Sequence, residues 1–279
     1  MCRKRDFGGQ LVWIAGASSG IGKELACLLN QQNARVILSG RRTELLKKIC
    51  DDCCNSENAH YVALDLTDKA SIDNAISEVL AIGVPDLIIL NSGIAQKGLV
   101  INNSDEIERS IMETNFFGTV SLTKRMLPYL FERKSGKIAV VSSIAGVVGV
   151  PGRSSYAASK HALHGYFESL RAEVHKYNLE IVMVMPGFIN TQITVKELKS
   201  DGTPFGQVEK SHQMGMSAEE CAERIISGLA RKKNNIIVGG MEVFGVYLKR
   251  FLPSMYDLFI RNHPMKRLNH FRKMFGSKR

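Results

Sequence analysis

The chain has 279 residues, a hydrophobic content of 44% and a formal net charge of +10 at pH 7. These values exclude a disordered or collagen-like protein and are sufficient for one large domain. The charge is concentrated at the C-terminal end, where residues 241–279 hold nine basic and two acidic side chains. Residues 1–240 are nearly neutral and show no basic stripe, so we expect no nucleic-acid partner.

The expected location is cytoplasmic, with peripheral membrane contact as a further possibility. No apolar run approaches the roughly 18 residues that a membrane span needs. The first ten residues are charged and lack the apolar centre of a signal peptide. Three of the six cysteines cluster as Cys50, Cys53 and Cys54, without a second Cys-x-x-Cys or a histidine pair nearby. We therefore expect free thiols and no metal site.

Apolar runs alternate with helical patterns along the chain. Runs at 11–15, 36–39, 61–64, 86–90, 138–141, 179–185 and 236–238 predict about seven buried strands. Strands alternating with helices predict an α/β Rossmann-like, doubly wound parallel sheet in one domain over residues 1–240. Residues 191–215 are too long and aperiodic for a simple connection, which indicates a lid over a pocket. Residues 241–279 form a basic amphipathic extension.

The first strand-to-helix junction carries a glycine-rich turn, Gly16 to Gly22. Such a turn brings backbone N–H groups to a pyrophosphate at a helix N-terminus. The second strand ends at Gly40, Arg41 and Arg42, without the acid that NAD sites place near the adenosine ribose. The two arginines favour the 2′-phosphate of NADPH/NADP+; the alternative is a solvated helix start.

A tyrosine and a lysine four residues apart follow the fifth strand, so a helix would place Tyr156 and Lys160 on one face. The nearby ammonium is expected to lower the pKa of the tyrosine. Ser143 lies at the carboxyl end of strand 138–141, the edge where ligands bind in doubly wound folds. Asn115 lies inside a helix predicted from about residue 105 to 132, where a buried asparagine needs partners and often a water. Taken alone, the Tyr-Lys pair could be an ordinary helix-surface pair.

These segments together resemble the short-chain dehydrogenase/reductase family, in its non-extended branch, from about Gly9 to Val238. The resemblance rests on AGASSGIG, the Asn91-containing LNSG, Asn115, Ser143, YAASK and PGFINT, in that order. Ala15, Leu90 and Ser92 depart from the usual family pattern beside these motifs. The departures leave the positions of the catalytic motifs intact.

The resemblance implies a role for each motif. Tyr156 would be the general acid, Ser143 would orient the carbonyl group, and Lys160 would lower the tyrosine pKa and hold the nicotinamide ribose. Asn115 would hold a water that links Lys160 to solvent. The implied cofactor-binding residues are Gly16, Ser18, Ser19, Gly20, Ile21 and Gly22 at the phosphates, Asp65 and Leu66 at the adenine, Asn91 at the adenosine side, and Ile189 and Thr191 at the carboxamide, besides Tyr156 and Lys160.

We therefore expect an NADPH-dependent oxidoreductase that reduces a ketone or aldehyde to an alcohol. Val147, Val148, Val150 and Phe188 indicate an apolar or lipid-like carbonyl substrate, although such residues are usually core. Two other classes remain open. One is a cofactor-binding regulatory protein with little or no turnover, and the other is a membrane-docking scaffold that works through its basic tail.

Family members commonly pair through the helices that carry Asn115 and Tyr156, so we expect a homodimer or homotetramer. Ala158, Ala162, Gly165 and Ser169 offer close approach, while Leu163, Tyr166, Phe167 and Leu170 offer apolar area. The alternative is that this apolar face serves only the core of the subunit. In the tail, apolar residues from Val243 to Phe259 recur at helical spacing beside cations. They are typical of an interfacial helix, or of packing over the pocket or a neighbouring subunit.

Overall fold

A computed structural model describes residues 7–191, 197–199, 202–203, 205–206 and 213–261. Its centre is a seven-stranded parallel sheet in the order β3-β2-β1-β4-β5-β6-β9, which confirms the predicted fold class. The strands are β1 (Leu11–Ala15), β2 (Arg35–Gly40), β3 (Ala59–Ala63), β4 (Leu87–Leu90), β5 (Gly136–Val141), β6 (Leu179–Pro186) and β9 (Asn235–Val238). The chain builds outward from β1 on both sides, so the switch point lies between β1 and β4, where doubly wound folds bind their ligands.

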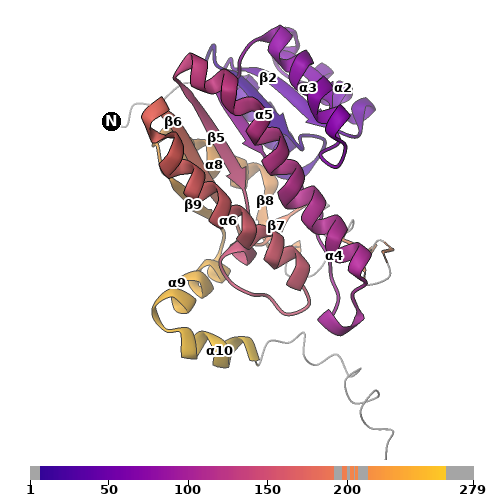
Figure 1. Cartoon of the computed structure of the whole chain (residues 1–279), viewed down its shortest axis with the longest axis vertical. Coiled ribbons are helices and arrows are strands. Elements are labelled where there is room, and N and C mark those ends of the chain that lie inside the picture. Colours follow the sequence, from indigo (N-terminus) through magenta and orange to yellow (C-terminus); the bar gives the residue numbers. More distant parts are fainter. Residues whose placement is uncertain (1–6, 192–196, 200–201, 204, 207–212, 262–279) are drawn as a thin grey trace, which may run out of the picture.

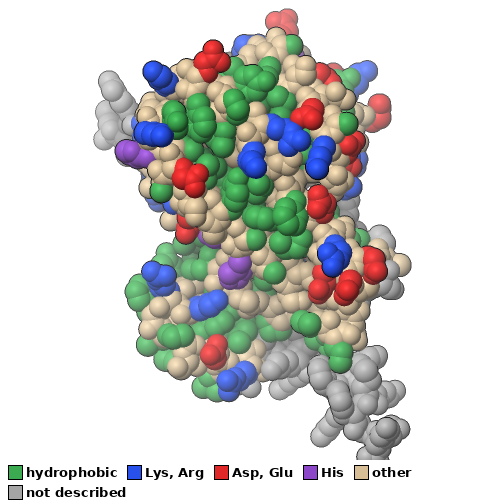
Figure 2. Space-filling view, viewed as in Figure 1, with side chains coloured by type: hydrophobic (Ala, Val, Ile, Leu, Met, Phe, Trp, Pro, Cys, Tyr) green, Lys and Arg blue, Asp and Glu red, His purple; other side chains and the backbone are tan. Residues whose placement is uncertain are grey.

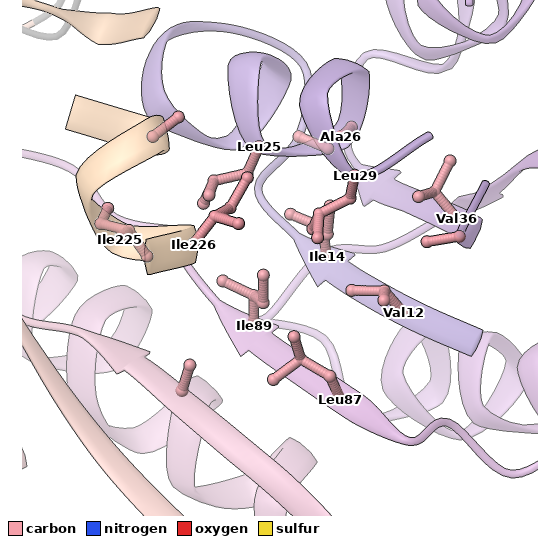
Figure 3. Close-up of a cluster of buried hydrophobic side chains, with 14 of the residues drawn as sticks. Val12, Ile14, Leu25, Ala26, Leu29, Val36, Leu87, Ile89, Ile225 and Ile226 are labelled. Carbon is pink, nitrogen blue, oxygen red and sulfur yellow. The ribbon is translucent and has the colours of Figure 1, made fainter. Parts of the chain in front are cut away.

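Helices cover both faces of the sheet (Figure 1). One face carries α1 (Gly20–Gln31), α2 (Thr43–Asp51) and α8 (Ala218–Ala230), and the other carries α3 (Lys69–Ile82), α5 (Gly118–Arg133) and α6 (Ser154–Val174). Because strand side chains alternate between faces, Val12 and Ile14 pack beneath α1 and α8, whereas Trp13 packs on the opposite side. Figure 3 shows the first of these two clusters.

The helix predicted over residues 105–132 is interrupted at its centre. It consists of α4 (Asp105–Met112), a π-helical turn η3 (Glu113–Phe117) and α5. Asn115 lies within the π-turn and is fully buried. A π-turn inserts one extra residue into a helix and is frequent at functional sites. It explains how a poor helix former is accommodated there, which helical periodicity did not reveal.

A two-stranded ladder follows the main sheet. β7 (Ile189–Asn190) pairs with β8 (Met216–Ser217), and the Ser217 hydroxyl accepts a hydrogen bond from the Glu220 N–H at 3.0 Å to cap α8. Most of the predicted lid between β7 and β8 lies outside the described residues. Its described part includes Glu197, Leu198 and Lys199, and Leu198 forms a parallel bridge with Gln96 in the segment after β4.

The described part of the tail forms η6 (Met241–Val243), α9 (Phe244–Phe251) and α10 (Pro253–Arg261), which lie together at one end of the molecule (Figure 1). Val246 and Tyr256 are buried against Ile144 and Val148, residues of the segment that follows β5. The Tyr256 hydroxyl donates to the Gly149 carbonyl at 2.8 Å. Part of the tail therefore packs beside the predicted substrate side. In the part of the chain that the structure describes, no helix is long and apolar enough to cross a membrane.

Candidate active site

The glycine turn is fixed from both neighbouring strands. Gly16 has a φ of +92°, and a Cβ added to it would lie 2.6 Å from the backbone nitrogen of Ser92. Its N–H donates to the Ser39 carbonyl of β2 at 2.7 Å, and its carbonyl accepts from the Asn91 side chain at 2.8 Å. Gly22 also has no room for a side chain, because its Cβ would meet the Gly16 carbonyl. The turn is therefore a fixed backbone cradle at the start of α1.

A cation reaches this cradle from the end of β2. Arg42 Nη2 donates to the hydroxyls of Ser18 at 2.6 Å and Ser19 at 3.0 Å. Arg41 is exposed and lies near Asp65, at the end of β3. The predicted arginine pair and the predicted phosphate cradle are thus brought together in space, although they are some twenty residues apart in the chain.

Asp65 and Leu66, the predicted adenine contacts, lie directly after β3, and their contact with a nucleotide stays a prediction. Partial burial opposes ionisation of Asp65, but hydrogen bonds from Thr67 and the nearby Arg41 outweigh it and lower the pKa of this carboxyl. The Asp65 carboxylate holds the turn before α3 through the Thr67 N–H at 2.9 Å and hydroxyl at 2.8 Å. The side chain of Leu66 is buried in the core, with its carbonyl against Gly118 of α5. Only backbone groups of Leu66 could face a nucleotide.

Ser143, Tyr156 and Lys160 meet at the carboxyl end of β5. Ser143 is hydrogen-bonded to the Tyr156 side chain, and its hydroxyl also accepts from the Ala145 N–H at 3.1 Å. Lys160 Nζ donates to the Val141 carbonyl, the last residue of β5, at 2.9 Å. The same nitrogen lies 5.8 Å from the centre of the Tyr156 ring.

The electrostatics of this group differ from the prediction. Burial raises the pKa of Tyr156, and the hydrogen bond from Ser143 and the charge of Arg153 only partly oppose this shift. Burial also lowers the pKa of Lys160 from 10.5 to about 8. The predicted net lowering of the tyrosine pKa is therefore wrong for this structure, because desolvation is the largest influence on Tyr156 and raises its pKa.

Asn115 ties the segment after β4 to α6. Its Oδ1 accepts from the Ile94 N–H at 2.8 Å, and its Nδ2 donates to the Ile94 carbonyl at 2.9 Å and to the Ser159 hydroxyl at 3.0 Å. A Cβ on Gly93 would lie 3.2 Å from Asn115 Oδ1 and 3.4 Å from Lys160 Nζ. Gly93 thus passes between the two side chains. The side chain of Asn115 is held by protein groups, and its role in a water relay stays a prediction.

The carboxamide side of the predicted site has an anchor that sequence reasoning missed. Thr191 lies beside Gly20, whereas the side chain of Ile189 is buried in the core. In the loop between β6 and β7, the Phe188 N–H donates to Glu242 Oε1 at 2.8 Å. Glu242, at the start of the tail, therefore fixes the loop that follows β6. Its position after Gly239 and Gly240 carries no motif that could have revealed it.

A buried ion pair was also missed. Arg153 directly precedes α6 and binds Glu197 through both guanidinium nitrogens, with the Nη2–Oε2 distance at 3.2 Å. Glu197 is 0% exposed and Arg153 is 7% exposed. A lone acid in an aperiodic segment gives no sequence signal of burial, because the pairing depends on where the segment folds back.

The residues present fit a nicotinamide dinucleotide. The backbone cradle of Gly16 and Gly22 excludes side chains from the start of α1, where a pyrophosphate binds in this class of fold. Arg42 places a positive charge beside this cradle and orients the hydroxyls of Ser18 and Ser19 there. Among the described residues, no cluster of three or more His, Cys, Asp or Glu side chains is arranged to hold a metal ion.

A doubly wound sheet with this cradle and a Ser–Tyr–Lys group at the end of β5 is the architecture of a dinucleotide-dependent oxidoreductase. The family model described as short chain dehydrogenase matches residues 10–202. Dehydrogenase/reductase SDR family member 7B of Bos taurus is 35% identical over 255 residues, covering 88% of this chain and 78% of that protein. Dehydrogenase/reductase SDR family protein 7-like of Drosophila melanogaster is 36% identical over 277 residues, covering 97% and 85%. The chain belongs to the short-chain dehydrogenase/reductase family of oxidoreductases.

Solved structures show the same fold. A short-chain dehydrogenase/reductase from Burkholderia phymatum in complex with NAD superposes with a TM-score of 0.79 at 19% identity, covering 90% of this chain and 96% of that one. A short-chain dehydrogenase from Burkholderia cenocepacia J2315 in complex with NADP superposes with a TM-score of 0.76 at 22% identity, covering 91% and 98%. The similarity establishes the fold and leaves the choice between the two cofactors to the residues of this chain.

The burial of Lys160 predicts a stability that depends on pH. Below pH 8 the folded state carries the buried ammonium, which disfavours folding. Between the folded pKa of about 8 and the unfolded value of 10.5, the unfolded state binds the proton that the folded state has released, so this group raises the free energy of unfolding as pH rises. We expect Lys160→Met to be more stable than wild type at pH 7, by about 1–3 kcal/mol, with the difference shrinking toward pH 10.

Urea unfolding at pH 7, 8, 9 and 10 measures this difference. Lys69→Met, which removes an exposed lysine from α3, serves as the control and should show no such trend. A Lys160→Met protein less stable than wild type at pH 7, or a difference in stability that does not change with pH, would contradict the lowered pKa of Lys160.

Proposed function

We propose that this protein is an NADPH-dependent reductase of ketones or aldehydes, with Tyr156 as the general acid. The observation that carries the proposal is the group of Ser143, Tyr156 and Lys160 at the carboxyl end of β5, in which the Tyr156 side chain is hydrogen-bonded to Ser143 and Lys160 Nζ donates to the Val141 carbonyl. A general acid must hold its proton at the working pH and release it to a positioned oxygen. A tyrosine meets the first condition because its ordinary pKa is about 10, and the neighbouring Ser143 hydroxyl provides the second.

Each side chain has one task in the proposed reaction. A hydride to the carbonyl carbon is the chemistry that the reduced cofactor supplies when bound. Ser143 donates a hydrogen bond that orients the carbonyl oxygen, and Tyr156 transfers its proton to the same oxygen as negative charge develops there. Lys160, anchored on Val141, places a positive charge near the phenolate that remains and so favours the transfer.

An apolar substrate is supported by what surrounds Ser143. Val148 and Ile144, just after β5, pack with Val246 and Tyr256 from the tail, with Val147 and Val150 partly buried beside them. We infer that the substrate side beside Ser143 is bordered by these aliphatic and aromatic side chains. They favour a lipid-like carbonyl compound over a small charged one, because an apolar wall offers a charged group no partner.

The proposed acid is tested by Tyr156→Phe, which keeps the ring and removes the proton. We expect turnover of the best substrate in a carbonyl panel to fall by roughly 10²-fold or more. The dissociation constant for NADPH, measured by fluorescence titration, should stay near that of wild type. Turnover of the variant within a few-fold of wild type would remove Tyr156 from the role of general acid.

NADPH is proposed as the cofactor because the end of β2 offers Arg41 and Arg42 and no acid. We expect wild-type protein to bind NADPH at least 10-fold more tightly than NADH, since charge-assisted hydrogen bonds to a phosphate contribute about 1.5–3 kcal/mol. Arg41→Asp should reverse this preference. Arg42→Ala should weaken both cofactors, because Arg42 also holds Ser18 and Ser19.

Isothermal titration with each cofactor measures these affinities. Lys47→Asp, the same change of charge at an exposed position of α2, is the matched control and should leave the preference unchanged. Equal affinity of the wild type for NADPH and NADH would overturn the cofactor assignment.

We also propose that the protein is at least a dimer, joined through the outer face of α5 and α6. Figure 2 shows hydrophobic side chains gathered over these helices, and Phe117 is 52% exposed. Leu163, Phe167 and Leu170 were predicted to supply apolar area to this face. That prediction is wrong, because all three are buried in the core of the subunit. The small residues do face outward: Ala158, Gly165 and Ser169 are exposed and Ala162 is partly exposed.

Gly165→Arg tests this interface. A Cβ at Gly165 would meet no atom within 4 Å in the single subunit, so the substitution should leave the fold intact and block only a close partner. We expect multi-angle light scattering at micromolar concentration to give at least a dimer for wild type and a monomer for Gly165→Arg. Ser77→Arg on exposed α3 should remain oligomeric. A monomeric wild type would refute the proposal.

The outer face of α9 and α10 supports peripheral membrane contact as a second activity. Its apolar side chains are more than half exposed, at Phe244, Phe251, Leu252, Met255, Leu258 and Phe259. Arg250 and Arg261 lie on the same two helices, whereas Lys249 of α9 donates to the Val147 carbonyl; Figure 2 shows basic and apolar side chains together at this end. Apolar anchors beside cations are what an interfacial helix offers to anionic lipid head groups.

Vesicle sedimentation tests membrane contact. Full-length protein should sediment with vesicles that contain anionic phosphatidylserine and be released as salt rises, because the Debye length shortens. The variant Phe251→Ser/Leu258→Ser/Phe259→Ser should lose most of this binding. Val100→Ser/Ile101→Ser, a matched removal of exposed apolar side chains elsewhere, should retain it. Identical partitioning of the two variants would contradict docking through α9 and α10.

A further inference from the structure

The Arg153–Glu197 ion pair lies where three separate segments meet. Glu197 precedes Leu198, whose N–H donates to the Ala95 carbonyl at 2.9 Å and whose carbonyl accepts from the Lys97 N–H at 2.9 Å. On its other side, the Glu197 carbonyl accepts from the Phe205 N–H at 2.7 Å. The pair therefore joins the start of α6, the proposed catalytic helix, to the segment after β4 and to the segment after β7.

The same pair is next to the proposed general acid. Arg153 is the residue that precedes the first turn of α6, and Tyr156 lies within that turn. The Ala157 N–H donates to the Arg153 carbonyl at 2.8 Å, so the backbone of Arg153 begins the helix that presents Tyr156. The charge of Arg153 favours the phenolate form of Tyr156, and the charge of Glu197 opposes it.

Keeping this pair buried is costly for the fold. Both side chains are removed from water, and removing two charges from water costs several kcal/mol per ion before their attraction is counted. An apolar pair of similar volume would often give equal or greater stability. A purely structural contact between the two segments would therefore not need charges.

We propose that Arg153 and Glu197 are paired positioning residues, which hold segment 197–199 against the start of the catalytic helix and balance opposite charges beside the Tyr156 hydroxyl. The proposal deepens the proposed function, since it rests on Tyr156 as the proton donor. With both charges present, they act on the proton affinity of the Tyr156 hydroxyl in opposite directions. Loss of the Arg153 charge alone should raise the proton affinity of Tyr156, and loss of the Glu197 charge alone should lower it.

Charged groups on the elements packed around the start of α6 keep their own partners when the pair is changed. Lys160 faces it from the next turn of α6 and is bonded to β5. Glu108 of α4 accepts from the Ser155 hydroxyl at 2.9 Å, and Lys249 of α9 donates to the Val147 carbonyl at 3.0 Å. A shift seen on changing Arg153 or Glu197 alone can therefore be assigned to the pair.

The direct test is the pKa of Tyr156, measured by NMR on full-length protein that carries tyrosine labelled with ¹³C at the ζ carbon. Tyr156→Phe assigns the signal, so the measurement needs no substrate. We expect Glu197→Gln to lower this pKa and Arg153→Gln to raise it, each by about half a pH unit or more, because the first change removes a negative charge and the second a positive one. The alkaline limb of kcat/KM for carbonyl reduction should move in the same two directions. Arg125→Gln, which breaks the exposed pair with Asp73, should move neither.

The double variant Arg153→Met/Glu197→Met covers the case in which a single unpaired charge prevents folding. It leaves neither charge buried alone, so the Tyr156 pKa should return to within about half a pH unit of wild type. The Leu198 amide, bonded to Ala95, should nevertheless exchange its hydrogen at least 10-fold faster, because segment 197–199 has lost its anchor. Unchanged Leu198 exchange in the double variant would overturn the positioning role.

Shifts of the Tyr156 pKa in the same direction in both single variants, or no shift in either, would overturn the charge balance. Failure of the proposed function looks different. If wild-type protein reduces no carbonyl compound in the panel, the reductase proposal fails while the NMR titration still decides the role of the pair.

Discussion

The contact between Lys160 and the last carbonyl of β5 is the constraint on which the site depends. An ammonium that is 3% exposed must find an acceptor, and the Val141 carbonyl at 2.9 Å provides one. This bond fixes α6 against the end of the sheet, and Tyr156 one turn earlier is thereby placed beside Ser143. Burial lowers the pKa of Lys160 to about 8 and raises that of Tyr156, so the same desolvation disfavours the charged form of both side chains.

The backbone frame of this site follows from local chemistry, which is why the sequence predicted it. Buried parallel strands are continuous apolar runs, and the turn from Gly16 to Gly22 contains glycines that no other residue can replace sterically. The order of motifs then placed Ser143, Tyr156 and Lys160 at one sheet edge, as the structure has them. Arg42 beside the glycine turn follows from the same rule, since β1 and β2 are neighbours.

What the sequence did not show depends on contacts between distant segments. The π-turn at Asn115 exists because its side chain binds Ile94 and Ser159, and neither partner can be read from helical periodicity. The Arg153–Glu197 pair depends on how an aperiodic segment folds back, and the Glu242 contact with Phe188 on where the tail begins. The direction of the tyrosine pKa was mispredicted for a related reason: the neighbouring charge is visible in the sequence, whereas desolvation is a property of the fold.

The central claim is that hydride delivery and proton donation meet at Ser143 and Tyr156. The most direct measurement is a single turnover of full-length protein with NADPH deuterated at C4, against a panel of apolar ketones and aldehydes, followed by mass spectrometry of the alcohol. The account predicts an alcohol with one deuterium on the former carbonyl carbon, formed faster with NADPH than with equally deuterated NADH. Tight binding of NADPH with no deuterium transferred to any member of the panel would contradict it.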